Sequence, residues 1–352
     1  MLRKIISWIG LLLGLGALAA HYVTPWPSVW AIRAVFDSGA ASASAALEKH
    51  LPANVTTRAA LRYDAVDPDA LLDIHRPAQP TETAPVVVWI HGGGFVSGRR
   101  QDIENYLKIL AGRGFITVNV DYTIAPEATY PTPTRQFARA LAYLDRNREA
   151  LGLGDRRFVL AGDSAGSQLA AQQANIITSP NYAKAQGIAA PIAPDRLAGA
   201  LLHCGVYDVG AMKTDAGGVL GWFMRTVTWA YSGQRDWRDV PGFETFTVTN
   251  YLTPRFPPTF ISAGNADPLL LQSQLMDQKL RAQGVAVDSL FFPADYAPAL
   301  SHEYQFNLDN AAGRQALDRT VAWLGRLADQ SPGETALPAS SPPSSVSSAP
   351  VI

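Results

Sequence analysis

The sequence predicts an α/β fold, with a mostly parallel eight-stranded sheet flanked by helices and covered by a helical cap. From about residue 58, short apolar runs alternate with longer helical patterns, which is typical of strands joined by crossover helices. The run 86–90 (VVVWI) is apolar at every position, as in a parallel strand buried on both faces. The 352 residues, 47% of them hydrophobic, suffice for one large domain with a substantial core.

The predicted elements follow in chain order. An antiparallel pair at 61–66 and 71–75 opens the sheet. The remaining strands are expected at 86–90, 116–120, 158–161, 200–203, 259–263 and 289–292. Helices are expected at 101–112, 135–150, 165–178, 271–283 and 311–328. Ligands bind such sheets beyond the carboxyl ends of the strands, so motifs directly after strands matter most.

Two long stretches, 24–55 and 206–253, interrupt this alternation. The first carries Trp26, Trp30 and Phe36, and the second is also rich in aromatic side chains. A connection as long as the second usually has structure of its own or a function. We interpret both stretches as parts of a cap over the site, although any single aromatic residue in them is more often ordinary packing.

The two ends of the chain differ from the domain at 24–330. Arg3 and Lys4 precede an uncharged apolar run at 5–20, the pattern of a signal peptide or of an N-terminal membrane anchor at 1–23. As a helix, the run would span about 24 Å, and about 28 Å if extended to residue 23, against a bilayer core of about 30 Å. We favour the anchor slightly, and either interpretation predicts a protein of the cell envelope or an exported one. The Ser- and Pro-rich segment 331–352 is predicted to be a disordered tail.

Composition excludes several classes of partner and cofactor. The formal net charge is −1 and basic residues are not clustered, so nucleic acid is not an expected partner. Cys204 is the only cysteine, which excludes an intramolecular disulfide. Few histidines lie near it in the sequence, so we expect no structural metal site. The oligomeric state is left open.

A nucleophile motif follows the predicted strand at 158–161. Gly162-Asp163-Ser164-Ala165-Gly166 fits the G-x-S-x-G pattern and leads directly into an Ala-rich predicted helix. In such a turn the serine has strained backbone geometry, and side chains two residues away on either side would clash, hence the two glycines. The motif alone is only moderately specific, because a plain Gly-rich turn is the alternative. Its place between a buried strand and a helix favours Ser164 as a nucleophile.

A second glycine motif follows the strand at 86–90. His91-Gly92-Gly93-Gly94 would let backbone amides approach a developing oxyanion closely, and the amide of Ala165 would add another donor. Three glycines in a row can also be a flexible turn. That alternative weakens because the same chain carries the serine motif. We expect His91 to orient the loop and not to act as a base.

After a serine on such a strand–turn–helix motif, the acid and then the histidine base are expected further along the chain. Only His203 and His302 follow Ser164, and His203 at the end of a predicted strand is better explained as a core residue. His302 follows the last predicted strand and is therefore the expected base. Asp267, on a turn after the strand at 259–263, is the expected acid that holds the imidazole tautomer, with Asp208 as the alternative.

Together these residues resemble the hormone-sensitive-lipase-like family of α/β-hydrolases, in particular its acetyl-esterase-like carboxylesterases. The resemblance rests on the HGGG at 91–94, the segment ending in APE at 125–127, the GDSAG at 162–166, the DPL at 267–269, and His302. It spans roughly residues 60–328. The resemblance implies an α/β-hydrolase fold, hydrolysis of small carboxylic esters with short or medium acyl chains, a helical cap and no cofactor.

The expected reaction is therefore two-step acyl transfer through an acyl-enzyme on Ser164. Two alternatives stay open. An amidase or formamidase would use the same triad, and a non-catalytic ligand-binding homologue would have kept the pocket without the chemistry. A membrane is a further expected partner, through residues 5–23.

Overall fold

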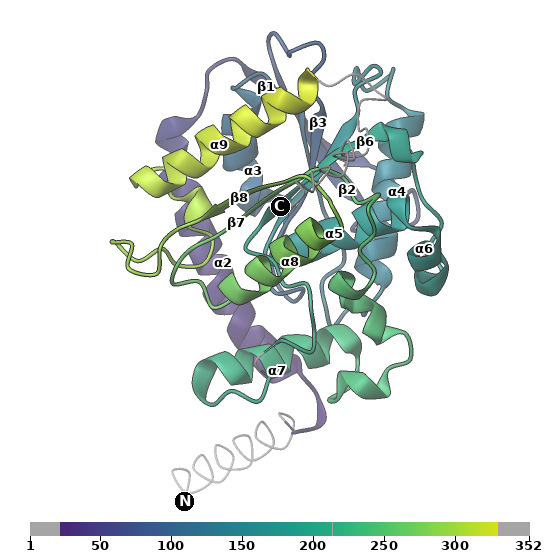
Figure 1. Ribbon diagram of the computed structural model, residues 1–352, viewed down its shortest axis with the longest axis vertical. Helices are drawn as coiled ribbons and strands as arrows, with labels where there is room; N and C mark the ends of the chain where they lie inside the picture. Colours follow the sequence, from purple (N-terminus) through teal and green to yellow (C-terminus); the bar gives the residue numbers. More distant parts are fainter. Residues whose placement is uncertain (1–21, 213, 330–352) are drawn as a thin grey trace, which may run out of the picture.

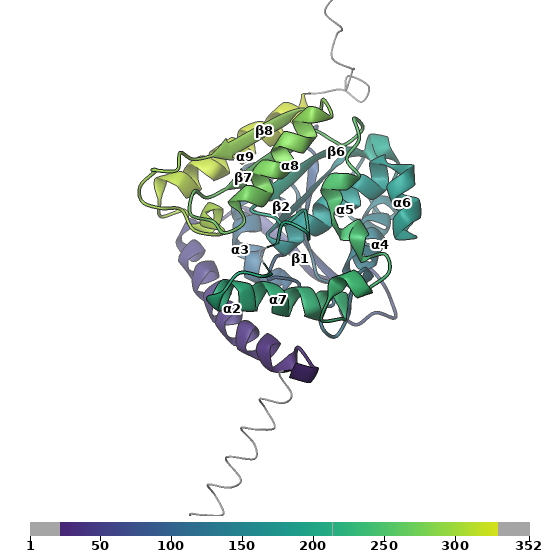
Figure 2. The same cartoon turned by 60° about the horizontal axis from the view of Figure 1, so that its bottom comes forward.

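One eight-stranded sheet with helices on both faces forms the centre of the molecule (Figures 1 and 2). The computed structural model describes residues 22–212 and 214–329. The strands are β1 (Val55–Arg62), β2 (Leu71–Pro77), β3 (Val86–Ile90), β4 (Thr117–Val120), β5 (Phe158–Asp163), β6 (Leu197–His203), β7 (Thr259–Ala263) and β8 (Val287–Phe291). Their order in the sheet is β1-β2-β4-β3-β5-β6-β7-β8. The predicted α/β architecture, a mostly parallel eight-stranded sheet flanked by helices, is confirmed.

The sheet is parallel from β4 through β8, and the first two strands are antiparallel to their neighbours. β3 and β5, at the centre, are buried at every position. Alternate residues of β3 enter different core clusters, with Val88 on one face of the sheet and Trp89 on the other. Burial on both faces explains why the sequence of β3 is apolar throughout.

The prediction for the first strand was wrong by several residues. β1 ends at Arg62, whereas the predicted strand runs over 61–66. β1 is an edge strand with mostly exposed side chains, so it lacks the apolar alternation that marks a half-buried strand. Beyond it, Asp64 and Asp67 bond the amides two residues ahead, at 3.1 Å each, and turn the chain.

Most helices lie within a few residues of their predicted positions. They are α3 (Arg100–Ala111), α4 (Thr132–Arg146), α5 (Ala165–Thr178), α8 (Leu270–Ala282) and α9 (Ala311–Ala328). The short α6 (Pro180–Gln186) was not predicted. It begins at a Ser179 cap and ends at Gly187 in the left-handed conformation. Its seven residues are too few to show a helical period.

The two stretches outside the alternation contain helices that pack on each other. α2 (Trp26–Leu47) lies in the first, and α7 (Gly218–Ser232) lies in the second. The second also holds the 3-10 helices η3 (Trp237–Asp239), η4 (Phe243–Phe246) and η5 (Val248–Asn250). The rings of Phe36 and Phe223 join α2 to α7, with centroids 5.5 Å apart. Both views show α7 and the start of α2 at the end of the molecule opposite α9 (Figures 1 and 2).

In the part of the chain from 22 to 329 that the structure describes, no helix has both the length and the apolar character needed to cross a membrane. The apolar run 5–20, predicted to be a signal peptide or an anchor, lies outside the described residues. The same holds for the predicted tail at 331–352.

Candidate active site

Ser164 sits on the turn between β5 and α5, in a backbone conformation that L-residues rarely adopt. Its φ is 51° and its ψ is −118°. A Cβ at Gly162 would lie 2.4 Å from the carbonyl carbon of Gly166, and a Cβ at Gly166 would lie 2.0 Å from the oxygen of Ile90. Both motif glycines are therefore required by close backbone contacts, as the sequence predicts.

The structure brings Ser164, His302 and Asp267 together at the carboxyl ends of the strands. Nε2 of His302 lies 3.0 Å from Oγ of Ser164, and Nδ1 of His302 lies 2.9 Å from Oδ2 of Asp267. The other oxygen of Asp267 accepts the amide of Leu269 at 2.7 Å. The carboxylate is thus held from two sides. An imidazole oriented in this way can take a proton from the serine hydroxyl.

The alternative candidates lie elsewhere. Asp208 accepts the amide of Gly210 at 2.8 Å and shapes a local turn. The ring of His203, at the end of the interior strand β6, is fully buried, and its Nδ1 lies 2.8 Å from Oγ of Ser262. Burial lowers the pKa of His203 to about 3. His203 is therefore a neutral core histidine.

The surroundings of His302 favour its protonated form. Burial alone would lower the pKa of His302, but the hydrogen bond to Asp267 and the charge of Glu303 hold it well above its ordinary value. Glu303 places Oε1 3.8 Å from Nε2 of His302. The motif pattern gives no sign of this shift, which depends on contacts that the fold creates.

The glycine loop after β3 differs from the prediction at one residue. The amide of Gly92 donates to Oδ2 of Asp163 at 2.9 Å, so Gly92 does not have its N–H available for an oxyanion. Gly93 and Gly94 follow with φ of 97° and 62°, in the region that favours glycine. The N–H of Ala165 belongs to the first turn of α5 and has no partner within the helix. Gly93, Gly94 and Ala165 remain the candidate oxyanion donors.

Asp163 connects the two motifs. Besides the amide of Gly92, it accepts the indole N–H of Trp89 at 2.7 Å. Burial, followed by the charge of Glu303, raises the pKa of Asp163 to about 8. The carboxyl group of Asp163, a motif residue, therefore supports the site by joining the glycine loop to the serine turn.

His91 supports the loop from behind. Its ring stacks on Tyr122 with centroids 4.4 Å apart, and its Nδ1 lies 2.9 Å from the oxygen of Gly92. The hydroxyl of Tyr122 donates to the same oxygen at 3.2 Å. His91 is buried, and burial lowers its pKa. These contacts agree with an orienting residue and not with a base.

Helix α2 holds the outer side of the same loop, through residues that sequence reasoning missed. Arg33 donates to the oxygen of Val96 at 2.6 Å and pairs with Glu127, the last residue of the APE segment. Asp37 accepts the hydroxyl of Ser97 at 2.9 Å. The APE segment drew attention to Glu127, but no local pattern in the sequence identifies Arg33, 94 residues earlier, as its partner.

Helix α7 lies over the loop. A Cβ at Gly94 would meet Phe223 at 3.1 Å and Val227 at 3.3 Å, so these two side chains cover the loop at van der Waals distance. The aromatic content of 206–253 predicted packing in this region, but it did not identify which side chains face the glycines.

Cys204 completes the surroundings of the triad. It follows β6 with a φ of 43°, and burial raises the pKa of its thiol to about 11, so the thiol is protonated at neutral pH. Its sulfur and ligand atoms of Asp267 and His302 lie within 4.8 Å of one another, a spacing that a metal ion could use. Asp267 is already bonded to His302, and His302 to Ser164, which is the arrangement of a proton relay.

Comparison with known proteins concerns the same region of the chain. A family model described as alpha/beta hydrolase fold matches residues 87–297, more than half of the chain. Esterase B from Lactobacillus rhamnosis has a solved structure that is 23% identical, with a TM-score of 0.71, over 86% of this chain and 96% of that one. Esterase LipW from Mycobacterium marinum is 25% identical, with a TM-score of 0.64, over 86% and 90%. A hyperthermophilic esterase from the archaeon Pyrobaculum calidifontis is 21% identical, with a TM-score of 0.66, over 85% and 91%.

These matches confirm the resemblance that the HGGG and GDSAG motifs indicated. The matched residues begin in β3, directly before the first motif, and extend past Asp267. This chain belongs to the hormone-sensitive-lipase-like family of α/β-hydrolases.

Proposed function

We propose that this protein is a serine carboxylesterase that cleaves small carboxylic esters with short to medium acyl chains. The observation that carries the proposal is the chain of hydrogen bonds from Oγ of Ser164 through the ring of His302 to Asp267. A hydroxyl facing an imidazole that is backed by a carboxylate is the arrangement that activates a serine for acyl transfer.

The first half of the reaction forms an acyl-enzyme. Ser164 attacks the ester carbonyl while His302 takes its proton, and Asp267 stabilises the resulting imidazolium. The amides of Gly93, Gly94 and Ala165 donate to the oxyanion, a contribution of about 3–4 kcal/mol for each donor in related sites. His302 then protonates the departing alcohol.

The second half repeats the chemistry with water as the nucleophile. His302 removes a proton from water, the resulting hydroxide attacks the acyl carbonyl, and the same amides hold the second oxyanion. Collapse of that intermediate releases the acid and returns the proton to Ser164. No cofactor takes part in either half.

Esters are favoured over amides by the relatives with solved structures. The three compared above are all described as esterases, and one structure of the Lactobacillus esterase is of a form inhibited by a tributyrin phosphonate. The limit on acyl length is supported by Phe223 and Val227, which leave little space above Gly94.

The test is the rate on p-nitrophenyl esters of increasing chain length, with p-nitroanilides of the same acids for comparison. We expect turnover of the acetate and butyrate, weak turnover of long chains, and slower turnover of the anilides. Ser164→Ala should abolish turnover and labelling by a fluorophosphonate probe, whereas Ser301→Ala, on the exposed neighbour of His302, should retain both. Labelling of the Ser164→Ala variant, or faster turnover of anilides than of esters, contradicts the proposal.

We also propose that the protein resides in the cell envelope or is exported, with its N-terminal segment acting as a membrane anchor or as a signal peptide. Arg3 and Lys4 precede the run 5–20, and no charged residue occurs again before Arg33. The mass of the protein isolated from membranes and from the medium decides between the two forms of the proposal. A chain that retains residue 1 is anchored, and a chain that begins near residue 20 has lost a signal peptide.

A further inference from the structure

Exposed apolar side chains gather at the start of α2. Of the eight large hydrophobic side chains that are exposed in the described chain, four lie between residues 22 and 35. They include Val23, Trp30 and Val35, which are 81%, 61% and 70% exposed, respectively. A fifth, Val219, is 79% exposed at the start of α7, which packs against α2. A cluster of this kind marks an interaction surface more often than scattered single residues do.

The outward face of α2 lacks charge from its start to Val35. The helix has 22 residues, and its only charged side chains are Arg33 and Asp37. Arg33 is partly buried and bonds Glu127 and the oxygen of Val96. Asp37 is exposed, accepts a hydrogen bond from Ser97 and follows the exposed apolar cluster in the chain. A helix face in water normally carries charged side chains, because they keep it soluble. The outward face of α2 up to Val35 therefore suits a less polar environment.

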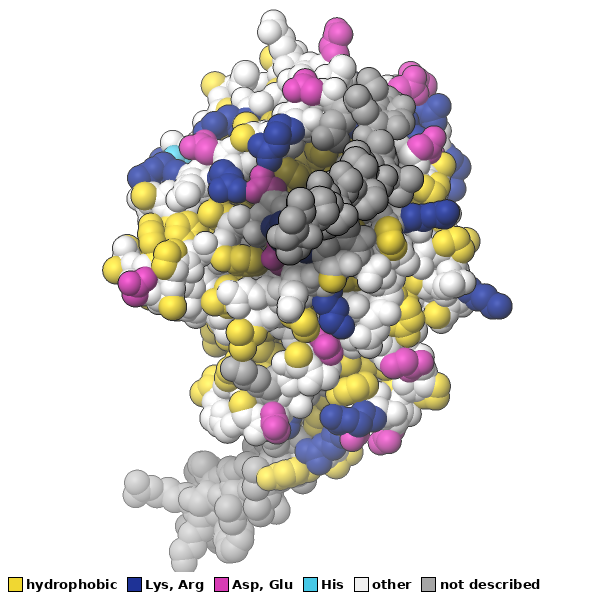
Figure 3. Space-filling view, in the orientation of Figure 1, with side chains coloured by type: hydrophobic (Ala, Val, Ile, Leu, Met, Phe, Trp, Pro, Cys, Tyr) yellow, Lys and Arg dark blue, Asp and Glu magenta, His cyan; other side chains and the backbone are white. Residues whose placement is uncertain are grey.

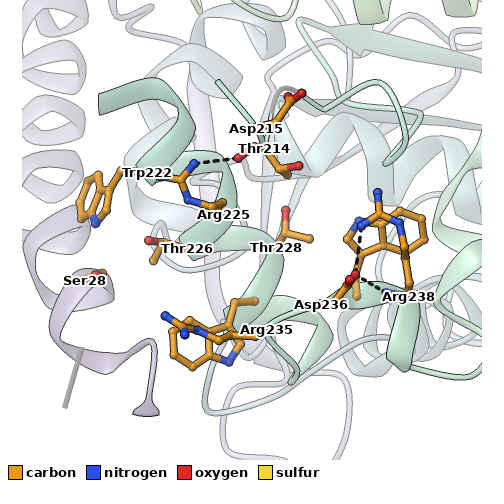
Figure 4. A pocket seen from close by; sticks show the side chains of 12 residues that line it. Ser28, Thr214, Asp215, Trp222, Arg225, Thr226, Thr228, Arg235, Asp236 and Arg238 are labelled. Atoms are coloured by element: carbon orange, nitrogen blue, oxygen red, sulfur yellow. Dashed lines mark hydrogen bonds and ion pairs between the residues drawn. The ribbon is translucent and has the colours of Figure 1, made fainter. Parts of the chain in front are cut away.

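A hollow beside this face combines indole rings with guanidinium groups. It has a volume of about 520 Å³ and lies between Ser28 at the start of α2 and the region 214–238 (Figure 4). Arg235 lies 4.9 Å from the ring of Trp229, and Arg238 lies 4.7 Å from the ring of Trp237. Figure 3 shows hydrophobic side chains beside basic and acidic ones at this end of the molecule. Tryptophan and arginine are both suited to the boundary between hydrocarbon and water, because each has an apolar body and a polar end.

The chain enters the domain at the same place. The guanidinium of Arg235 lies 5.6 Å from the ring of Tyr22, so residue 22 is held beside the hollow. The apolar run of the sequence ends at residue 20, which leaves a single residue between the run and this contact. No linker of useful length separates the apolar segment from the cap.

We propose that this end of the cap docks on the surface of a lipid bilayer. The docking face consists of residues 22–25, the outward side of α2 from Trp26 to Val35, the start of α7 at Val219, and the hollow between the two helices. The proposal goes beyond an N-terminal anchor, because it assigns the folded domain a fixed orientation on the membrane.

This orientation has a consequence for the site. Phe223 and Val227 lie one and two turns along α7 from Val219 and contact Gly94, so the docking face and the candidate oxyanion loop adjoin the same helix. Esters dissolved in the bilayer would reach the site past the cap without crossing bulk water. The hollow is lined by three arginines and two aspartates, so the positive and negative charges nearly cancel. Docking should therefore depend on apolar burial and respond weakly to salt and to anionic lipid.

Single introduced cysteines test the orientation on the full chain. Cys204 is the only cysteine and is buried, so a fluorophore attaches to the introduced residue alone. The test variants are Val35→Cys and Val219→Cys. The controls are Leu51→Cys, beyond the far end of α2, and Ala322→Cys, on the exposed side of α9. Each labelled protein is reconstituted in phosphatidylcholine vesicles, with and without phosphatidylglycerol, and with nitroxide-labelled lipid as the quencher.

We expect the labels at 35 and 219 to shift to shorter emission wavelength and to be quenched about twofold or more, while those at 51 and 322 stay unchanged. Equal quenching at all four positions, or none at 35 and 219 in vesicle-bound protein, overturns the proposal. A shift without lipid that grows with protein concentration would assign the face to a second copy and overturn it as well. The protein without an introduced cysteine, treated with the same fluorophore, shows whether Cys204 is labelled.

Discussion

The backbone amide of Gly92 donates a hydrogen bond of 2.9 Å to Oδ2 of Asp163. These residues belong to the two glycine motifs, which are 71 residues apart in the chain. The bond leaves Gly92 without a free N–H, but it determines where the next two amides lie relative to Ser164. Electrostatic stabilisation of an oxyanion depends on donors that are already in position, so this contact belongs to the catalytic geometry.

Replacing Asp163 with Asn should lower kcat by about 10- to 100-fold and change KM much less, because a displaced loop weakens binding of the transition state more than of the ester. The amide of Asn has one acceptor oxygen for the two donors that Asp163 serves. Trp89→Phe is the control, since it removes the indole donor and keeps the bond to Gly92. Steady-state rates on p-nitrophenyl acetate provide the measurement. An equal loss in both variants would argue against a special role for the Gly92 contact.

Asp267→Asn should reduce kcat by roughly 10⁴-fold, because the neutral amide favours the wrong imidazole tautomer and cannot stabilise imidazolium. The same change at Asp208 should leave kcat within about threefold of the original, since Asp208 bonds only a local turn. Thermal melting of both variants checks that each is folded. The assignment of the acid fails if Asp208→Asn is the more damaging change.

The acidic limb of kcat/KM should lie above the ordinary histidine pKa of about 6.5, because the pKa of His302 is raised. Its neutral form is the base, so activity appears as the pH rises through that pKa. Glu303→Gln removes a negative charge 3.8 Å from Nε2, which should lower the pKa of His302 and move the limb to lower pH. Rates well above the limb should change little. If the acidic limb moved to higher pH in this variant, Glu303 would not be raising the pKa of His302, and the prediction would be wrong.

Phe223→Ala should extend turnover to longer acyl chains, because it opens space directly above Gly94. Rates on acetate should change less than rates on octanoate. The neighbouring Trp222 lines the hollow on the other side of α7, so Trp222→Ala is a matched control that should leave the chain-length profile as it was. Identical profiles in both variants would exclude Phe223 as the side chain that limits acyl length.

Gly166→Ala should destabilise the fold by about 1–3 kcal/mol or more, because its Cβ would overlap the oxygen of Ile90 at 2.0 Å. The same change at Gly325 in α9 meets no atom within 4 Å and should stabilise the protein by about 0.5–1 kcal/mol. Urea unfolding of both variants gives the comparison. If the two variants unfolded at similar urea concentrations, the turn at Gly166 would have room for a Cβ, and the prediction would be wrong.

The sequence alone predicted features that depend on neighbouring residues in the chain. The strand at 86–90, the turn at Ser164 and the helix after it each follow from the pattern of their own residues, because burial on two faces or a sharp turn restricts which residues fit. Chain order and position after the predicted strands favoured His302 and Asp267 as partners for the serine, with Asp208 as an alternative for the acid. The edge strand β1 was misplaced because exposed positions carry no apolar alternation.

Only the tertiary structure decided which distant groups meet. The bond from Gly92 to Asp163, the pairing of Arg33 with Glu127 and the contact of Phe223 with the Gly94 loop join residues from different parts of the chain. No single-residue pattern specifies such pairs, because many acids, amides and aromatic rings could have met each partner. The packing of α2 and α7 selects the last two pairs, since close-packed side chains leave each of these groups one position.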